Sequence, residues 1–274
     1  MKGYLFALFL IPCAVGCNDA PAPPPPAKGG DESTVSTPVP AGKDIGLPAP
    51  LKGEELIRHA GYTLSYNEKH EQANWVAYKL TRKGELRSAN HARTDRFLAD
   101  PEVAKGSAGN ADYEGSGFDR GHLAPAEDMD GSKVTMAESF YYSNISPQKP
   151  AFNRGVWRRL EELVRFWGVT YDSIFIVTGP VLTGKLATIG PNKVSVPDYY
   201  FKAVLQLKKG KARAIGFLLP NEASAATLKS FAVPVDDLEK RTGLDFFAQL
   251  PDDVEKAVEK DPEIDSWKWT RSKK

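Results

Sequence analysis

Four consecutive residues near the middle of the chain combine an acid, a guanidinium, a flexible residue and an imidazole. They are Asp119, Arg120, Gly121 and His122, and the glycines and proline around them indicate a bent strand or loop, not a long helix. A neutral imidazole can accept a proton from water near neutral pH, and a guanidinium can hold a phosphate oxygen through parallel hydrogen bonds. These residue types suit attack on a phosphate, although an ion-paired turn is the simpler interpretation of the four residues alone.

The composition limits the arguments that can be made from the whole chain. Its 274 residues are enough for one sizeable domain with a hydrophobic core. It carries 36 lysines and arginines against 35 acids, so the net charge is close to zero. Bulk charge therefore gives no argument for a nucleic-acid partner, which would need basic residues concentrated in one place.

The cysteines and histidines argue against a zinc protein. The two cysteines, Cys13 and Cys17, both precede the region expected to fold, so the folded domain has no disulfide and no cysteine-based metal site. The four histidines are scattered and lack the spacing of a zinc-binding helix. Neither a structural nor a catalytic zinc is expected.

The chain begins with a pattern typical of export. Residues 4–15 are nearly all apolar and too short to span a bilayer, and they run into AVGC at residues 14–17, which resembles a bacterial lipobox. This predicts a signal peptide over residues 1–16 and a lipid on Cys17 as a membrane anchor. The expected location is the bacterial cell envelope, periplasm-facing or anchored in the outer membrane. An ordinary signal peptide with an incidental cysteine is the alternative.

A proline-rich stretch separates this start from the rest of the chain. Residues 17–52 include four consecutive prolines at 23–26 and several glycines and serines, so they cannot bury enough apolar surface to fold. We expect them to form a lipid-anchored disordered tether. Residues 53–274 are expected to form the folded domain.

The remaining sequence predicts a mixed fold. Strands, two of which form a hairpin, are expected at residues 74–81, 173–178, 199–207 and 213–219. Helices are expected at residues 134–142, 153–168 and 235–242, and from Pro251 onward. Strands and helices do not alternate regularly, which favours an α+β fold with a largely antiparallel central sheet flanked by helices.

The helix expected at residues 153–168 has the clearest periodicity in the chain. Its apolar residues form one stripe that faces a core, consisting of Val156, Leu160, Leu163, Val164 and Trp167. Asn153 stands at its start, where an asparagine considered alone is best interpreted as a helix cap. On a regular helix, Asn153 and Glu161 lie about 12 Å apart along the axis.

Three ordered motifs together resemble a known family. They are DRGH at residues 119–122, YSNISPQ at 142–148 and NRGVWRRLE at 153–161. In these motifs the chain resembles the DNA/RNA non-specific endonucleases, of the Serratia-type and endonuclease G-like kind. The resemblance extends to residues 73–78, 177–180, 241–244 and 250–253, and so covers almost the whole chain after the tether.

The resemblance implies a ββα-metal active site. By its motifs, His122 matches the general base, and Asn153 matches the one direct protein ligand of a Mg²⁺ ion, for which Mn²⁺ can substitute. Glu161 matches an acid that holds metal-bound water. An ion pair with Arg158 or Arg165 along the helix is the alternative role of Glu161.

The resemblance also assigns roles to several polar residues. Arg93 matches the arginine that stabilises charge on the phosphate, with Arg96 as a rival for that role. Arg120 and Asn144 match positions that meet substrate or hold the other residues in place. Beside them, Arg154 and Arg158 are expected to bind substrate phosphates, and a solvated helix face is the alternative.

The implied function is magnesium-dependent hydrolysis of phosphodiester bonds in DNA and RNA, single- or double-stranded, with little sequence preference. Two alternatives stay open. One is a catalytically inactive nucleic-acid-binding lipoprotein of the same fold, and the other is a phosphodiesterase for a smaller substrate. The sequence leaves the oligomeric state undetermined, with a homodimer as one option.

Overall fold

The computed structural model describes residue 1 and residues 45–86, 91–208 and 211–270. The signal peptide predicted for residues 1–16, apart from Met1, lies outside these ranges, and so does most of the predicted tether. Over the described residues, the structure contains no helix with the length and apolar character needed to cross a membrane.

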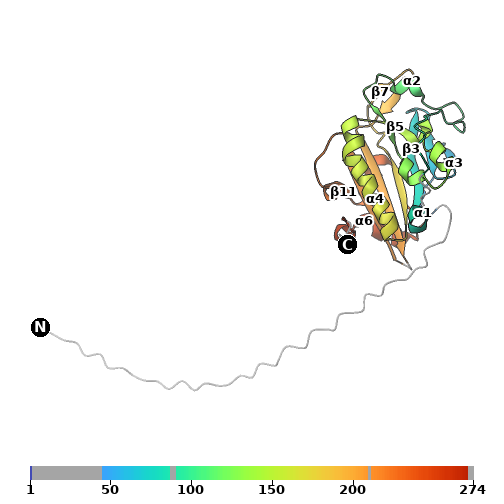
Figure 1. Cartoon of the computed structure of the whole chain (residues 1–274). Coiled ribbons are helices and arrows are strands. Elements are labelled where there is room, and N and C mark those ends of the chain that lie inside the picture. The colour runs from blue at the N-terminus through green and yellow to red at the C-terminus, as the bar shows by residue number, and fades with distance from the viewer. Residues whose placement is uncertain (2–44, 87–90, 209–210, 271–274) are drawn as a thin grey trace. The chain divides into compact units, whose positions relative to one another are not determined.

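Seven strands form one sheet in which every pair of neighbours is antiparallel (Figure 1). In sheet order they are β1 (Glu55–Arg58), β2 (Thr63–Asn67), β3 (Gln72–Thr81), β6 (Ser173–Pro180), β9 (Tyr199–Lys208), β10 (Lys211–Pro220) and β11 (Ala232–Val233). The predicted α+β class with an antiparallel central sheet is confirmed. The predicted hairpin is also present, as β9 and β10, which pair from Tyr199 and Pro220 to Lys208 and Lys211.

The sheet separates two hydrophobic cores because successive side chains of a strand point to opposite faces. On β3, Val76 and Tyr78 belong to the core beneath helix α4 (Arg158–Thr170). Trp75 and Ala77, on the other face, belong to the core beneath helices α5 (Val235–Thr242) and α6 (Asp252–Lys260). Each face of the sheet is therefore covered by helices, and Figure 1 shows α4 lying across one of them.

Helices α4 and α5 agree with the sequence patterns that predicted them. The apolar stripe of α4 is buried against the sheet, and Gly168 lets its last turn approach closely, since a Cβ there would lie 2.9 Å from that of Leu80. Helix α5 ends as predicted at Gly243, whose left-handed φ of 73° suits glycine. Its N–H donates to the carbonyl of Glu239 at 2.8 Å.

A second, two-stranded sheet precedes α4 and carries the motif residues. Strand β4 (Asp119–His122) pairs antiparallel with β5 (Ile145–Gln148), and the chain then enters the helical segment that leads into α4. The order strand, strand, helix is the ββα arrangement. The remaining elements are α1 (Arg82–Leu86), α2 (Asn110–Tyr113), α3 (Lys133–Glu138), β7 (Ala187–Ile189), β8 (Val194–Val196) and the 3-10 turns Ala126–Met129, Tyr142–Asn144, Leu228–Phe231 and Ile264–Ser266.

The start of the central helix differs from the prediction. Residues Phe152–Trp157 form a π-helical turn, within which Gly155 leaves helical geometry at φ −110° and ψ −109°, and the regular helix begins at Arg158. Asn153 lies inside this turn and its N–H donates to the carbonyl of Lys149, so it is not a helix cap. The axial separation of about 12 Å that a regular helix would give between Asn153 and Glu161 therefore does not apply.

The helix predicted at residues 134–142 is shorter than expected. Helix α3 ends at Glu138, because the backbone beyond it bonds elsewhere. Leu98 donates to the carbonyl of Phe140 at 3.2 Å and accepts from the N–H of Tyr142 at 2.9 Å. These bonds, with burial of both aromatic rings, outweigh the helical pattern that the sequence shows.

The folded region begins before the predicted boundary at residue 53. Ile45 is buried, 4% exposed, in the core beneath α5 and α6. The N–H of Ala49 donates to the carbonyl of Asp245 at 2.8 Å. The prolines of this stretch favoured a tether, but two apolar side chains, Ile45 and the half-buried Leu47, attach it to the domain.

We therefore expect Ile45→Ala to destabilise the domain by about 2–4 kcal/mol, because it leaves a cavity in a packed core. The measurement is urea unfolding of the full chain followed by circular dichroism. Leu56→Ala is the matched control: Leu56 is 42% exposed on β1, so its loss should cost less than about 1 kcal/mol. Equal stability of Ile45→Ala and the wild type would show that the core does not depend on this segment.

Candidate active site

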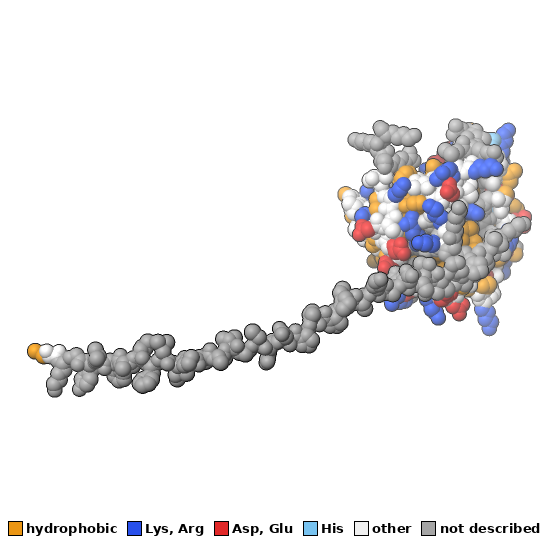
Figure 2. Space-filling model, turned by 90° about the horizontal axis from the view of Figure 1, so that it is seen from below, with side chains coloured by type: hydrophobic (Ala, Val, Ile, Leu, Met, Phe, Trp, Pro, Cys, Tyr) orange, Lys and Arg blue, Asp and Glu red, His pale blue; other side chains and the backbone are white. Residues whose placement is uncertain are grey.

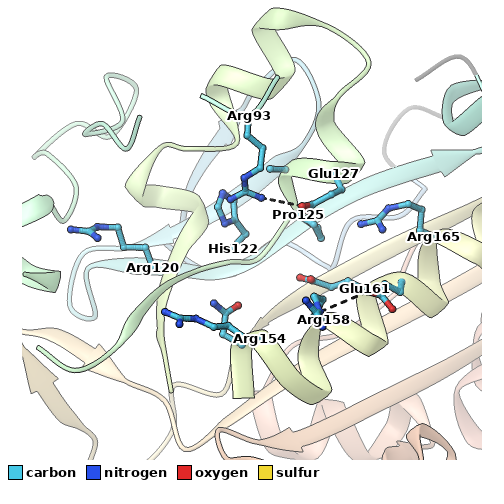
Figure 3. A pocket seen from close by; sticks show the side chains of 12 residues that line it. Arg93, Arg120, His122, Pro125, Glu127, Arg154, Arg158, Glu161 and Arg165 are labelled. Atoms are coloured by element: carbon cyan, nitrogen blue, oxygen red, sulfur yellow. Dashed lines mark hydrogen bonds and ion pairs between the residues drawn. The ribbon is translucent and has the colours of Figure 1, made fainter. Parts of the chain in front are cut away.

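Residues of the first and third motifs line one cavity of about 260 Å³ at the junction of β4 and the helical segment (Figure 3). Its lining residues are Arg93, Arg120, His122, Pro125, Ala126, Glu127, Asn153, Arg154, Arg158, Glu161, Glu162 and Arg165. Five arginines and three glutamates make the cavity cationic, although the chain as a whole is nearly neutral. The local concentration of basic residues that a nucleic-acid partner requires is therefore present here.

His122 ends strand β4 with its imidazole held between aromatic rings. The ring lies 4.9 Å from that of Phe140, edge to face, and 5.7 Å from that of Phe97. Its Nε2 is buried and has no hydrogen-bond partner among the described residues. Burial, and secondarily the charge of Arg93, lower the pKa of His122 to about 4, so the imidazole is neutral at physiological pH.

Arg93 is held at the rim of the cavity. Its Nη1 donates to Oε1 of Glu127 at 3.0 Å, its Nε donates to Asp95 at 3.2 Å, and its guanidinium lies 5.3 Å above the ring of Phe140. Figure 3 shows Arg93 beside His122. Arg96 does not line the cavity, so the position of Arg93 favours it over its rival.

Asp119 organises the entrance of the helical segment. Its Oδ2 accepts from Nδ2 of Asn153 at 2.9 Å and from Nε of Arg154 at 2.8 Å, and its Oδ1 accepts from Nη2 of Arg154 at 2.6 Å. Because Asn153 donates through its nitrogen, its Oδ1 is left as an acceptor, and it accepts no hydrogen bond within the described part of the chain. The motif acid pairs with Arg154 and not with its neighbour Arg120, which argues against the ion-paired turn.

Glu161 contributes a carboxylate that forms no ion pair with any described residue. The arginines that were its alternative partners are engaged elsewhere, since Arg158 approaches Glu162 at 3.8 Å and Arg165 binds Asp128 at 2.7 Å. Burial raises the pKa of Glu161. An acid held this way can exchange hydrogen bonds with water in the cavity.

Arg165 and Asp128 belong to a buried group of charges beneath the cavity. Oδ2 of Asp128 also accepts from the hydroxyl of Tyr78 at 3.0 Å. Lys202, wholly buried on β9, lies with its ammonium 4.8 Å above the ring of Trp157. Burial lowers the pKa of Lys202, and the charges of Glu161 and Asp128 oppose that shift.

Arg120 is fixed by polar and aromatic contacts at the edge of the cavity. Its Nε donates to the hydroxyl of Tyr142 at 3.0 Å, and its Nη2 donates to the side-chain oxygen of Asn110. The guanidinium also lies 5.5 Å above the ring of Phe97. These contacts orient Arg120 while leaving it in the cavity lining.

Asn144 does not contact the cavity, which corrects its assignment as a substrate-binding residue. It is completely buried. Its Oδ1 accepts from the N–H of Ala124 at 2.9 Å, and its Nδ2 donates to the carbonyls of Ala124 and Ser139 at 2.9 and 2.8 Å. Since its hydrogen-bonding groups are satisfied by backbone, Asn144 fixes the segment that follows His122. This agrees with the other interpretation of Asn144, that it holds site residues in place.

The donors in the cavity suit a hard divalent cation. Carboxamide and carboxylate oxygens are the ligands that Mg²⁺ prefers, and it retains several waters when few protein ligands are offered. Oδ1 of Asn153 and the carboxylate of Glu161 supply such oxygens on one cavity wall. The residues present therefore fit the expected cation.

Sequence reasoning missed the roles of Asp119, Glu127 and Lys202. Asp119 stands in the first motif, but only the fold brings it to Asn153, 34 positions later. Lys202 interrupts the aromatic and apolar run at residues 199–205, and this was a signal that could have been used. No sequence pattern pointed to Glu127, because its contact with Arg93 depends on the path of the segment that contains Arg93.

A ββα unit, an antiparallel sheet and an arginine-rich cavity define the chain as a metal-dependent nuclease of the ββα-metal class. The model of the DNA/RNA non-specific endonuclease family matches residues 44–253, and the chain belongs to this family. The predicted family and the prediction of an enzyme that hydrolyses nucleic acid are confirmed.

Two relatives and one solved structure illustrate the similarity. The chain is 34% identical over 261 residues to mitochondrial endonuclease G of Bos taurus, covering 90% of this chain and 84% of the relative. It is 37% identical over 220 residues to the mitochondrial nuclease EXOG of Xenopus laevis, covering 74% of this chain but 61% of that longer protein. A chain in the crystal structure of the EndoG/EndoGI complex superimposes with a TM-score of 0.71 at 29% identity, over 77% of this chain and 91% of that one.

These comparisons contradict the predicted location. The relatives are mitochondrial nucleases, not exported bacterial lipoproteins. The prediction of a cell-envelope protein anchored by a lipid on Cys17 was therefore wrong. It rested on a short apolar run followed by small residues and one cysteine, a pattern with little information beside the similarity of a whole domain.

The environment of His122 leads to a prediction about its titration. We expect an NMR titration of the imidazole to give a midpoint near pH 4. Because the charge of Arg93 disfavours the imidazolium and that of Glu127 favours it, Arg93→Gln should raise the midpoint and Glu127→Gln should lower it. Arg96→Gln, in the same exposed segment but outside the cavity, is the control and should leave the midpoint unchanged. A wild-type midpoint near the ordinary value of about 6.5 would contradict the buried environment.

Proposed function

We propose that the chain hydrolyses phosphodiester bonds of DNA and RNA with Mg²⁺ as its cofactor, His122 as general base and Asn153 as the direct metal ligand. The observation that carries this proposal is the meeting of an imidazole, a carboxamide and a carboxylate in one arginine-rich cavity, although they come from β4, the π-helical turn and α4. Membership of the endonuclease family supports the same reaction.

His122 accepts the proton of the attacking water. A lowered pKa keeps its imidazole neutral across the physiological range, so it is ready to accept a proton. Its contacts with Phe97 and Phe140 fix the ring plane and limit where the attacking water can stand. The low pKa makes the base weaker but always available, and activity that depends on it is lost only as the pH falls toward 4.

Asn153 and Glu161 would hold the cation from the helical side, Asn153 directly through Oδ1 and Glu161 through water. When bound, Mg²⁺ offsets negative charge on the phosphoryl and leaving-group oxygens, and Mn²⁺ can substitute for it. Asp119 keeps the carboxamide of Asn153 in one orientation by accepting from its nitrogen at 2.9 Å. That bond presents an oxygen, not an N–H group, to the cation.

The arginines of the cavity bind the phosphate backbone. Arg93, beside His122, is placed to stabilise charge on the attacked phosphate, while Arg120, Arg154 and Arg158 are placed to hold flanking phosphates (Figure 3). The face shown in Figure 2 carries both basic and acidic side chains. Backbone contacts of this kind carry no sequence information, so we propose cleavage with little sequence preference.

A phosphodiesterase for a smaller substrate is the remaining alternative. The spread of arginines around the cavity favours a polymer, because a single phosphate cannot contact all five. An enzyme for small diesters would need fewer cations. Comparing cleavage of plasmid DNA and structured RNA with cleavage of short model diesters separates the two functions, and preferred cleavage of the short diesters would contradict the proposal.

We expect His122→Ala and Asn153→Ala each to lower kcat/KM for plasmid DNA by about 10²–10⁴-fold, because the first removes the proposed general base and the second the proposed metal ligand. The measurement is plasmid nicking, with circular dichroism to show that the variants fold. His91→Ala is the matched control, since this histidine lies outside the cavity, and it should retain full activity. Unchanged activity of His122→Ala would remove the proposed base.

Removing the metal gives an independent prediction. We expect EDTA to abolish activity, and Mg²⁺ or Mn²⁺ to restore it, because the cavity supplies oxygen ligands that both ions accept. Asp119→Ala should raise the Mg²⁺ concentration needed for half-maximal activity by about tenfold or more, since Asn153 then loses the bond that orients it. Full activity of the wild type in excess chelator would exclude this mechanism.

A further inference from the structure

Three carboxylates meet where helices α5 and α6 contact each other. They belong to Asp236 and Glu239 on α5 and to Glu259 on α6, and one oxygen of each lies within 4.8 Å of the others. Both helices pack on the face of the sheet opposite α4. The cluster is therefore separate from the cavity that contains His122 and Asn153.

Glu259 is the unusual member of this cluster. It is 5% exposed, and its Oε1 is buried with no hydrogen-bond partner among the described residues. An unpaired carboxylate in such a place is costly, since burial removes its hydration without replacing it. Glu259 also stands in the last turn of α6, where the helix dipole disfavours a negative charge.

The surroundings of Glu259 add negative charge and little positive charge. Glu239, Glu255, Asp236 and Asp245 all act on it unfavourably. The charge of Lys240 acts on Glu239, but Lys240 forms its ion pair with Asp237, at 2.8 Å. None of the three clustered acids forms an ion pair with a described residue. Protein charges therefore do not neutralise the cluster.

The spacing of the oxygens fits a cation of a particular size. Ca²⁺ binds oxygens at about 2.3–2.6 Å in flexible geometry, so ligands on opposite sides of the ion are up to about 5 Å apart. Three oxygens within 4.8 Å of one another can therefore share one such ion. Mg²⁺ binds at about 2.0–2.1 Å, demands a nearly octahedral shell and gives up water reluctantly, which makes it a poorer fit.

We propose that Asp236, Glu239 and Glu259 bind a structural divalent cation, with Ca²⁺ preferred over Mg²⁺. Glu259 provides the buried ligand, and Asp236 and Glu239 complete a three-carboxylate site with water in the remaining positions. The ion connects the first turns of α5 to the last turn of α6. Its role is to stabilise the contact between these helices, independently of the reaction in the cavity.

Protonation of Glu259 is the other way to reduce the electrostatic repulsion within this cluster. Burial and the neighbouring acids raise the pKa of Glu259 to about 9, which allows a neutral carboxyl group at physiological pH when no ion is bound. A protonated cluster needs no ligand, so it is the outcome against which the cation site must be tested.

Calcium binding can be measured by isothermal titration calorimetry on the full chain. Asn153→Ala is used as the background, so that the cavity near His122 does not contribute a second site. We expect this protein to bind one Ca²⁺, to bind Mg²⁺ more weakly, and to melt at higher temperature in Ca²⁺. Adding Glu259→Gln should weaken calcium binding more than about tenfold and abolish the thermal shift.

Glu255→Gln in the same background is the matched control. It removes one negative charge from the same helix, near Glu259 but outside the ligand set, and should change calcium affinity by less than about threefold. If Glu259→Gln does not fold, Asp236→Asn replaces it and should also weaken binding more than about tenfold.

Three results would overturn the proposal. They are absence of calcium binding in the Asn153→Ala protein, equal binding after Glu259→Gln, and equal losses for Glu255→Gln and Glu259→Gln. A calcium-independent rise in melting temperature with Glu259→Gln, in a protein that binds no calcium, would assign the cluster to a protonated buried acid. None of these results bears on nuclease activity, so the two proposals fail separately.

Discussion

The carboxylate of Asp119 is the contact on which the geometry of the cavity depends. It joins strand β4 to the π-helical turn by accepting hydrogen bonds from Asn153 and from two nitrogens of Arg154. His122 lies on the same strand, so the Asp119 side chain helps to set the position of the imidazole relative to the carboxamide of Asn153. Charge-assisted bonds of this kind are short and directional, which suits a site that must hold its groups in fixed positions.

Beneath the cavity the protein maintains several buried charges, which is costly unless they are compensated. Asp128 is compensated by Arg165 and by the hydroxyl of Tyr78. Lys202 has no hydrogen-bonding partner for its ammonium among the described residues, and it relies on the face of Trp157 and on the nearby acids. Such a group stabilises a domain less than apolar residues of the same size would. Its charge acts on Glu161, which lines the cavity, so the buried ammonium is coupled electrostatically to the site.

Four strands of the sheet, β3, β6, β9 and β10, and most of its helices could be predicted from the sequence, because their signals are local. The alternation of residue types in β9 and β10 can be recognised from a few neighbouring residues, and so can the glycine that ends α5. The motifs placed His122 and Asn153 in one site because they resemble a family, and residue spacing alone could not have done so. The motif left two roles open for Asn144, because a motif does not show whether a side chain faces the cavity or the backbone.

Other errors have a common physical origin, namely interactions between distant segments. Helix α3 ended early because Leu98, about 40 positions away, bonds to the backbone of Phe140 and Tyr142. Ile45 belongs to the domain because it joins a core whose other buried residues come from Trp75 onward, far along the chain. Local composition at Ile45 is that of a linker, and no window of sequence around it contains the residues that bury it.

The π-helical turn at Phe152–Trp157 has an implication for how this stretch can evolve. The chain kinks at Gly155, between Asn153 and the regular helix α4. Loss of one residue there would move the Asn153 carboxamide out of its present position relative to Leu160 and Val164, which must stay against the sheet. Evolution can therefore substitute side chains in this stretch, whereas inserting or deleting a single codon would disrupt the site.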